Sequence, residues 1–172
     1  MNIYYIDIKK FKQNHDRKFI SRYADKEFKN EKRFYEYAIG RYLVKSVAKK
    51  FYKVEDCEII INDNSKPIFK NSDLNFSLSH SKDYAVACFD INQCGIDIEF
   101  IKDRNFKKIS QYYGENIETS EEFYQYWTLK EASYKLGQKV KDSFSTIFKN
   151  NYYLTIVSEK IFDKNIEIIH FE

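Results

Sequence analysis

The chain has 172 residues, of which 43% are hydrophobic and 18% aromatic, and its formal net charge is +3 at pH 7. This length suits one domain, or two small lobes that share a core, and the apolar content argues against disorder over most of the chain. The weak positive charge does not by itself predict a nucleic acid partner.

The three cysteines, Cys57, Cys88 and Cys94, lack a C-x-x-C spacing. The sequence therefore argues against a disulfide framework and against a zinc site. No apolar run approaches the length of a membrane-spanning helix, and the first residues lack the apolar core of a signal peptide. We accordingly expect a cytoplasmic protein with no membrane partner.

Alternating and apolar runs predict strands, and apolar residues at helical spacing predict helices. In chain order, the expected strands cover residues 3–8, 57–61, 74–78, 84–91, 95–101, 152–157 and 166–171. A helical period runs from about residue 18 to 53, in which residues 33–51 are the clearer helix, and further helices are expected over residues 106–113 and 120–136. The strands between residues 74 and 101 are joined by short connections, which favours an antiparallel meander there.

Single residues mark several boundaries of these elements. Gly40 lies inside the first helix, where it predicts close packing. Pro67 has no backbone N–H, so its segment is expected to be an edge strand or the start of a loop. The polar residues 79–81 are expected to end a strand. Ser120 is the expected N-cap of the last helix, and Gly137 its expected end.

The order of the elements predicts an α+β fold. It favours two similar α/β lobes in a pseudo-twofold arrangement with antiparallel sheets. We expect residues 1–172 to form a single unit, with approximate lobes 1–82 and 83–172 and the site in the cleft between them. A chain with two such halves is expected to be a monomer.

Two acids share one face of a predicted strand. In the segment 95–99, Asp97 and Glu99 alternate with the apolar Ile96 and Ile98. Side chains on a strand alternate between its faces, so both carboxylates point the same way. Taken alone, either acid could also belong to a solvated strand face.

A predicted helix carries a further acid and a lysine on one face. Trp127, Glu131 and Lys135 are spaced i, i+4 and i+8. Mg²⁺ prefers oxygen ligands and takes one or two carboxylates with phosphates and water, and a lysine suits a phosphate oxygen. The sequence therefore predicts a magnesium site of Asp97, Glu99 and Glu131 beside Lys135. The other reading of Lys135, a solvated i+4 partner of Glu131, does not exclude this role.

Together with Ser79-His80-Ser81 and Lys66-Pro67, these segments resemble motifs of the 4′-phosphopantetheinyl transferases. The resemblance is to the larger, two-lobed class typified by the surfactin synthetase activator, and it runs from about residue 20 to 150. It rests on the order and spacing of a Ser-His-Ser segment, the strand 95–99 and the helix 127–135. It implies the two-lobed fold of that family.

The resemblance implies a Mg²⁺-dependent transfer of the 4′-phosphopantetheine group of coenzyme A. The acceptor is a serine of an apo acyl or peptidyl carrier protein, and adenosine 3′,5′-bisphosphate is released. Asp97, Glu99 and Glu131 would hold the metal, and Lys135 would contact the α-phosphate. Asp97, Glu131 and Lys135 would thus serve both in catalysis and in coenzyme A binding.

The resemblance also assigns further contacts to coenzyme A. Lys66 and Pro67 would lie along the adenine, and Ser79 and His80 would bind phosphates. Candidates for the nucleotide 3′-phosphate are the basic residues Lys32, Arg33 and Arg41, because Arg and Lys suit anions with several oxygens. Basic residues on an amphipathic helix often simply face water.

The sequence departs from the family between Glu99 and Trp127, where this chain is short, and again at its short C-terminal end. The residue that removes the proton from the acceptor serine therefore stays open. The candidates are Glu131, Glu115, Glu118 and a metal-bound water. The shortened second lobe concerns the choice of carrier protein more than the chemistry.

Three other readings remain. The chain could be a non-catalytic module of the same fold that binds a carrier protein or a nucleotide. It could be a small basic interaction protein whose acids only pair with its lysines. It could also belong to the short trimeric carrier-protein synthases, but those place their first metal-binding Asp close to the N-terminus, whereas Asp97 lies past the middle of this chain.

Overall fold

The structure, a computed structural model, describes residues 1–103 and 105–172. Its helices are α1 (Ile8–Asn14), α2 (Arg17–Ser21), α3 (Glu31–Tyr52), α4 (Phe106–Tyr112) and α5 (Ser120–Leu136). Its strands are β1 (Asn2–Asp7), β2 (Ile59–Ile61), β3 (Pro67–Phe69), β4 (Asn75–Ser81), β5 (Tyr84–Asp90), β6 (Cys94–Phe100), β7 (Asp142–Phe148), β8 (Tyr152–Ser158) and β9 (Ile168–His170). None of the described helices is both long and apolar enough to cross a membrane.

The strands form two main sheets. One has the order β4-β5-β1-β9 and the other the order β6-β8-β7, while β2 and β3 form a separate pair. Neighbouring strands are antiparallel except β1 and β9, which run parallel. The fold is therefore mixed α and β with largely antiparallel sheets, in agreement with the predicted α+β class. The pseudo-twofold relation of two lobes stays a prediction.

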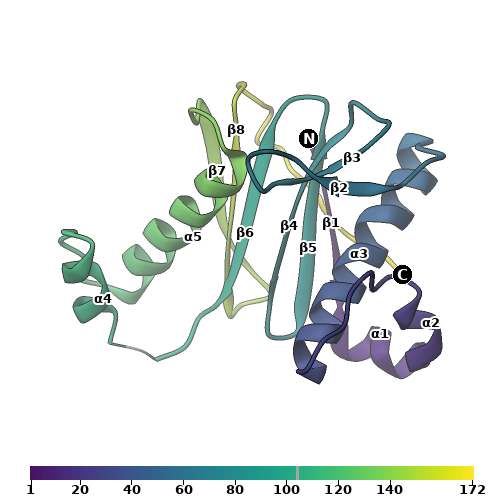
Figure 1. Cartoon of the computed structure of the whole chain (residues 1–172). Helices are drawn as coiled ribbons and strands as arrows, with labels where there is room; N and C mark the ends of the chain where they lie inside the picture. The colour runs from purple at the N-terminus through teal and green to yellow at the C-terminus, as the bar shows by residue number, and fades with distance from the viewer. Residues whose placement is uncertain (104) are drawn as a thin grey trace.

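The sheets and helices stack in layers, with α3 and α5 on opposite outer sides of the strands (Figure 1). Strand β1 shows how the layers are held, because its side chains alternate between two cores. Tyr4 and Ile6 belong to the core that α3 covers, whereas Ile3 and Tyr5 belong to the core between the two sheets. Helix α5 covers the outer face of the second sheet through further apolar contacts.

Strands β4 and β6 differ from the prediction. Residues 79–81 do not end β4, which continues through Ser81, because the hydroxyls of its serines have partners in the neighbouring strand. Strand β6 pairs with β8 and not with β5, so the predicted meander is wrong after β5. The alternating apolar residues of β6 are compatible with a place in either sheet, so the local pattern does not determine which sheet the strand joins.

The first sheet combines strands from both sides of the expected boundary near residue 82. Strands β5 and β9 follow that boundary and pair with β1, which precedes it. The division into lobes 1–82 and 83–172 stays a prediction.

Two short elements, α1 and β7, were not predicted, and α2 is a separate short helix within the helical period expected from about residue 18 to 53. Helices α1 and α2 have only seven and five residues. Each begins with an aspartate cap, Asp7 and Asp16, whose side chain accepts a backbone N–H. Strand β7 is half-exposed along most of its length, so it lacks a strong apolar alternation.

The predicted ends of α5 are nearly right. The helix begins at Ser120, but its N-cap is Thr119, which exchanges hydrogen bonds with Glu122 in a capping box. Gly137 ends the helix in the left-handed conformation, as predicted, with φ of 71°. Gly40 of α3 packs closely on Leu78, also as predicted, since an added Cβ would lie 2.8 Å from the Leu78 Cδ2.

Candidate functional site

A row of serine hydroxyls joins the two sheets where β4 lies beside β6. The backbone N–H groups of Ile96, Ile98 and Phe100 donate to Ser77, Ser79 and Ser81 Oγ at 3.1, 3.4 and 2.9 Å, respectively. Strand β6 pairs with β8 along its other edge, so these N–H groups need acceptors outside its sheet. Alternate serines on β4 face the same side and supply them.

Asp97 and Lys135 meet at this seam as an ion pair. Lys135 Nζ lies 2.7 Å from Asp97 Oδ1, and Ser79 Oγ donates to the same carboxylate oxygen at 2.8 Å. The ammonium group also donates to Ser79 Oγ at 2.9 Å and to the carbonyl oxygen of Ile96 at 3.1 Å. The residue Asp97 is only 5% exposed, whereas the Lys135 side chain is 27% exposed.

The second oxygen of this carboxylate has no hydrogen-bond partner among the residues that the structure describes. Asp97 Oδ2 is buried and accepts no hydrogen bond from the described residues. A buried polar atom without a partner is costly and calls for an explanation. A carboxylate oxygen of this kind is a suitable ligand for a hard divalent cation. A magnesium ion at Asp97 stays a prediction.

The other two predicted metal ligands lie on the same strand and on α5. Glu99 Oε2 accepts a hydrogen bond from Ser81 Oγ at 3.3 Å, and Glu131 is half-buried on α5. Over the described ranges, no three acidic, histidine or cysteine side chains are grouped closely enough to hold a metal ion. Ligation by Asp97, Glu99 and Glu131 together therefore stays a prediction.

The close approach of α5 to β6 depends on Gly95. A Cβ atom there would lie 2.1 Å from the carbonyl oxygen of Ala132 and 3.0 Å from the backbone nitrogen of Leu136. Only a residue without a side chain allows the helix backbone to lie on the strand at this distance. The glycine of the strand motif thus brings Lys135 within reach of Asp97.

A buried hydroxyl pair fixes α5 on the second sheet. Thr128 of α5 and Thr155 of β8 are fully buried, and their Oγ1 atoms are 2.6 Å apart. Ser145 Oγ of β7 lies 2.9 Å from Thr155 Oγ1. Trp127 stacks on Phe123 and packs, partly buried, against the apolar cluster between α5 and β8.

The residues predicted to contact adenine line a small cavity beside Lys135. The cavity has a volume of about 180 Å³, and its walls include Lys66, Pro67, Tyr134 and Lys135. The ammonium group of Lys66 donates to Gln93 Oε1 at 2.7 Å and to a backbone carbonyl at 3.1 Å. Burial lowers the pKa of Lys66. The lysine therefore holds the β2–β3 hairpin on the turn before β6.

Ser79 and His80 point to opposite faces of β4, as neighbours on a strand must. Ser79 is buried at the seam, whereas the His80 side chain is 42% exposed and its Nδ1 lies 3.9 Å from Glu36 Oε2. Partial removal from water lowers the pKa of His80, and the Glu36 carboxylate opposes that change. A shared contact of both residues with coenzyme A phosphates stays a prediction.

The three basic residues predicted for the 3′-phosphate separate on α3. Lys32 Nζ lies 3.5 Å from Glu36 Oε1. Arg41 is buried, with its guanidinium carbon 5.2 Å from the centre of the Tyr37 ring. Arg33 is exposed, one residue and therefore about 100° around the helix from Lys32. The structure does not gather these residues at one place.

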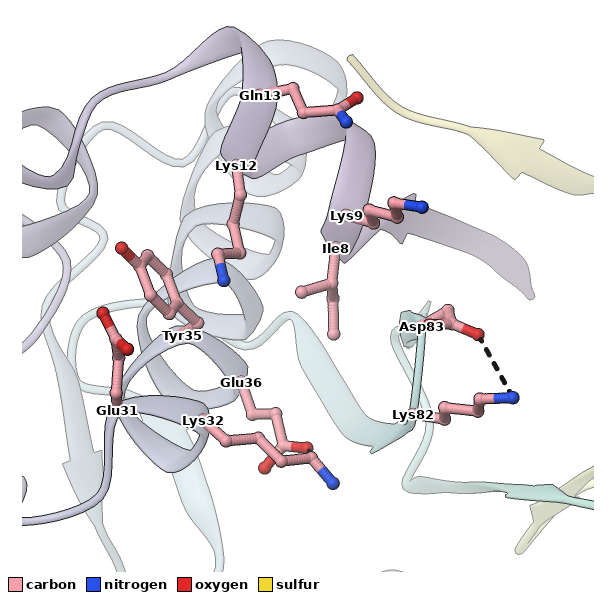
Figure 2. Close-up of a pocket in the computed structure, with 10 residues that line it drawn as sticks. All are labelled: Ile8, Lys9, Lys12, Gln13, Glu31, Lys32, Tyr35, Glu36, Lys82 and Asp83. Atoms are coloured by element: carbon pink, nitrogen blue, oxygen red, sulfur yellow. Dashed lines mark ion pairs between the residues drawn. The ribbon is translucent and has the colours of Figure 1, made fainter.

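A further cavity, which the sequence did not predict, lies between α1, the start of α3 and the β4–β5 turn (Figure 2). Its volume is about 540 Å³. Its wall carries charges of both signs, from Lys9, Lys12, Glu31, Lys32, Glu36, Lys82 and Asp83. Lys32 and Lys82 also line a neighbouring hollow with Ser81 and Glu99, so this cavity adjoins the seam.

The general base remains open. Glu115 and Glu118 are exposed on the segment between α4 and α5. The backbone N–H of Glu118 donates to the Glu122 side chain, which ties that segment to the start of α5. The positions of these two glutamates do not favour them over Glu131 or a metal-bound water as the general base.

The sequence reasoning missed Ser77, Ser81 and Glu36 as residues of this region. A signal for the serines exists in the sequence, because residues 77, 79 and 81 alternate and share one face once the predicted strand 74–78 is continued to residue 81. Glu36 had none, because its closeness to His80 depends on the packing of α3 against β4.

No protein-family model matches the chain. The chain is similar to the curated protein "4′-phosphopantetheinyl transferase gsp" of Aneurinibacillus migulanus, with 28% identity over 118 residues. The aligned part covers 62% of this chain and 49% of that protein, so it spans about half the length of the relative. This distant similarity supports a relationship to the phosphopantetheinyl transferases and leaves the two-lobed class open.

Proposed function

We propose that the chain transfers the 4′-phosphopantetheine group of coenzyme A to a serine of an apo acyl or peptidyl carrier protein. The second product is adenosine 3′,5′-bisphosphate, and the reaction depends on Mg²⁺. The observation that carries the proposal is the Asp97 carboxylate. One of its oxygens contacts Lys135, and the other is buried with no partner among the described residues. The similarity to a named transferase supports the same reaction class.

In the proposed reaction, the acceptor serine oxygen forms a bond to the β-phosphorus of coenzyme A. The bond from that phosphorus to the bridging oxygen breaks, and the nucleotide α-phosphate leaves with the electron pair. The serine proton passes to the general base. Negative charge grows on the leaving phosphate, so groups that stabilise charge there matter most for the rate.

The residues of the seam have separate parts in this reaction. Asp97, with Glu99 and Glu131, would hold Mg²⁺, which supplies positive charge to the pyrophosphate oxygens. Lys135 lines the cavity beside Pro67 and keeps part of its side chain exposed, so it can turn towards a phosphate bound there. That cavity would hold the base of the nucleotide. Since Asp97 and Lys135 come from the same chain, we propose that a monomer is sufficient.

The test is a transfer assay that is read by mass spectrometry. The purified chain is incubated with coenzyme A, Mg²⁺ and apo carrier proteins from fatty acid, polyketide and nonribosomal peptide systems. We expect at least one carrier to gain the mass of one phosphopantetheine group, and the Asp97→Asn variant to leave every carrier unmodified.

A chain that modifies none of these carriers contradicts the proposal. Calorimetric titration with coenzyme A then identifies the alternative. Binding without transfer indicates a non-catalytic module of the same fold, and the absence of Mg²⁺-dependent binding indicates an interaction protein.

A further inference from the structure

The serines of β4 do more than join the sheets. Ser79 Oγ and Ser81 Oγ each accept a backbone N–H of β6 and each donate to an acid of that strand, Asp97 at 2.8 Å and Glu99 at 3.3 Å. Ser77 accepts the third N–H in the same way. Among the hydrogen bonds of the described residues, none joins Ser77 to a carboxylate.

A hydroxyl has one proton to donate. When its oxygen accepts an N–H from β6, the direction of the remaining O–H is restricted, and in Ser79 and Ser81 it points at a carboxylate. Each serine therefore links the backbone of β6 to a side chain of the same strand through one atom. Partly buried networks of this kind fix the orientation of the groups that they join.

We propose that Ser79 and Ser81 are positioning residues that orient the Asp97 and Glu99 carboxylates for the metal ion. This inference rests on the proposed function and extends it to the hydroxyl groups that orient the predicted metal ligands. Partners of metal ligands set the ligands' direction and basicity, and their loss lowers metal affinity about 10- to 100-fold. Ser81 is the better residue to test, because Ser79 also contacts Lys135.

The experiment compares Ser81→Ala with Ser77→Ala. Each variant removes one hydroxyl that accepts a β6 N–H, at 2.9 and 3.1 Å, respectively. Only the first also removes a hydrogen bond to a metal-ligand candidate. Mn²⁺ binding is measured by electron paramagnetic resonance at saturating coenzyme A, because Ser77 also lines the cavity beside Lys135. Thermal unfolding of both proteins is followed in parallel.

We expect both variants to lose similar stability and only Ser81→Ala to lose Mn²⁺ affinity. The expected loss is about tenfold or more, against less than about twofold for Ser77→Ala. Ser81→Thr keeps the hydroxyl and should restore Mn²⁺ affinity. If Ser81→Ala does not fold, Ser81→Cys replaces it in the comparison. Its thiol is a weaker hydrogen-bond donor, so we expect a loss of Mn²⁺ affinity that is smaller than about tenfold but larger than that of Ser77→Ala.

Equal Mn²⁺ affinity of the Ser81 and Ser77 variants overturns the inference and leaves the proposed function standing. A wild-type chain that neither binds Mn²⁺ nor transfers phosphopantetheine overturns both. A Ser81→Thr protein that binds Mn²⁺ as weakly as Ser81→Ala also overturns the inference, because the hydroxyl would then not be the cause.

Discussion

The two sides of the β4–β6 seam differ in how well they assemble charged residues. On the β6 side, Asp97 and Lys135 are separated by 38 positions in the chain and meet at 2.7 Å. On the α3 side, Lys32, Arg33 and Arg41 belong to one helix, yet they separate into an ion pair, an exposed side chain and a buried stack on Tyr37.

The difference comes from what fixes each residue. The direction of the Asp97 side chain is set by its place in strand β6. The place of Lys135 is set by helix α5, whose backbone lies directly on that strand at Gly95. Nothing comparable directs the three basic residues of α3 to one point, because Arg33 lies about 100° and Arg41 about 180° around the helix from Lys32. Motifs on two packed elements locate a site better than basic residues on one helix.

The largest expected effect is that of Asp97→Asn, which removes the charge of the carboxylate and keeps its shape. We expect transfer to fall by about 10²–10³-fold or more, as when a group that stabilises transition-state charge is lost. Initial rates of carrier modification measure this effect, with circular dichroism as the control for folding. A folded variant that retains wild-type rates would show that Asp97 lies outside the site.

The next effect compares two lysines of α5. Lys135→Gln removes the ammonium beside Asp97, whereas Lys130→Gln removes one that is exposed and lies over the Tyr113 ring. We expect Lys135→Gln to lower kcat by about 100-fold with a smaller change in coenzyme A affinity, because its contact strengthens as the leaving group gains charge. The kcat of Lys130→Gln should stay within about twofold of the wild-type value. Equal losses of kcat in the two variants contradict the role of Lys135 at the leaving phosphate.

A comparison of two glycines tests the packing on each side. In Gly95→Ala the added Cβ meets the backbone of α5 at 2.1 Å, and we expect a loss of about 3 kcal/mol or more in the free energy of unfolding. In Gly40→Ala it meets the flexible end of Leu78, and the gain in helix propensity of about 1 kcal/mol offsets that contact. Urea denaturation measures both, and a Gly95 variant as stable as the Gly40 variant contradicts the close approach.

A smaller effect is expected at Glu36, whose carboxylate lies beside His80 and Lys32. A negative charge here opposes any phosphate that Lys32 would bind. We expect Glu36→Gln to bind coenzyme A about fivefold tighter, with less change for 3′-dephospho-coenzyme A, which lacks one phosphate. Calorimetry with the two nucleotides measures the difference, and an equal gain for both would place the 3′-phosphate away from Lys32.

The smallest effect is a pH dependence of stability at His80, whose pKa is lowered because neighbouring protein removes part of its water. Below the ordinary histidine pKa of about 6.5 the unfolded chain binds this proton first, so the folded chain loses stability as pH falls through that value. Wild type should therefore lose slightly more stability than His80→Gln between about pH 7.5 and 5.5. Urea denaturation of both proteins at the two pH values measures the losses in the free energy of unfolding. A loss in His80→Gln that equals or exceeds that of wild type contradicts the prediction.

Local patterns predicted the elements that matter for the site. The alternation around Asp97 and the i, i+4, i+8 spacing on α5 predicted the correct strand and helix, and Gly137 marked the correct helix end. The same rule of alternation could have shown that Ser79 and His80 face opposite sides of β4. The rule was not applied there because the strand was expected to end at these polar residues.

Other features depend on packing that no local pattern contains. The choice of β6 for the second sheet follows from its partner β8, more than fifty residues later in the chain. The ammonium of Lys66 turns to Gln93 and the Cys94 carbonyl only because the β2–β3 hairpin packs beside the turn before β6. The closeness of Glu36 to His80 likewise arises between α3 and β4.

The most direct test of the account is a crystal structure of the chain with coenzyme A and Mg²⁺. We expect the cation to bind Asp97 Oδ2, the oxygen that has no partner among the described residues. We expect the pyrophosphate to lie against Lys135 and the base to enter the cavity beside Pro67 and Tyr134. A cation and pyrophosphate bound elsewhere, with the Asp97–Lys135 ion pair intact and Oδ2 still unpartnered, would contradict it.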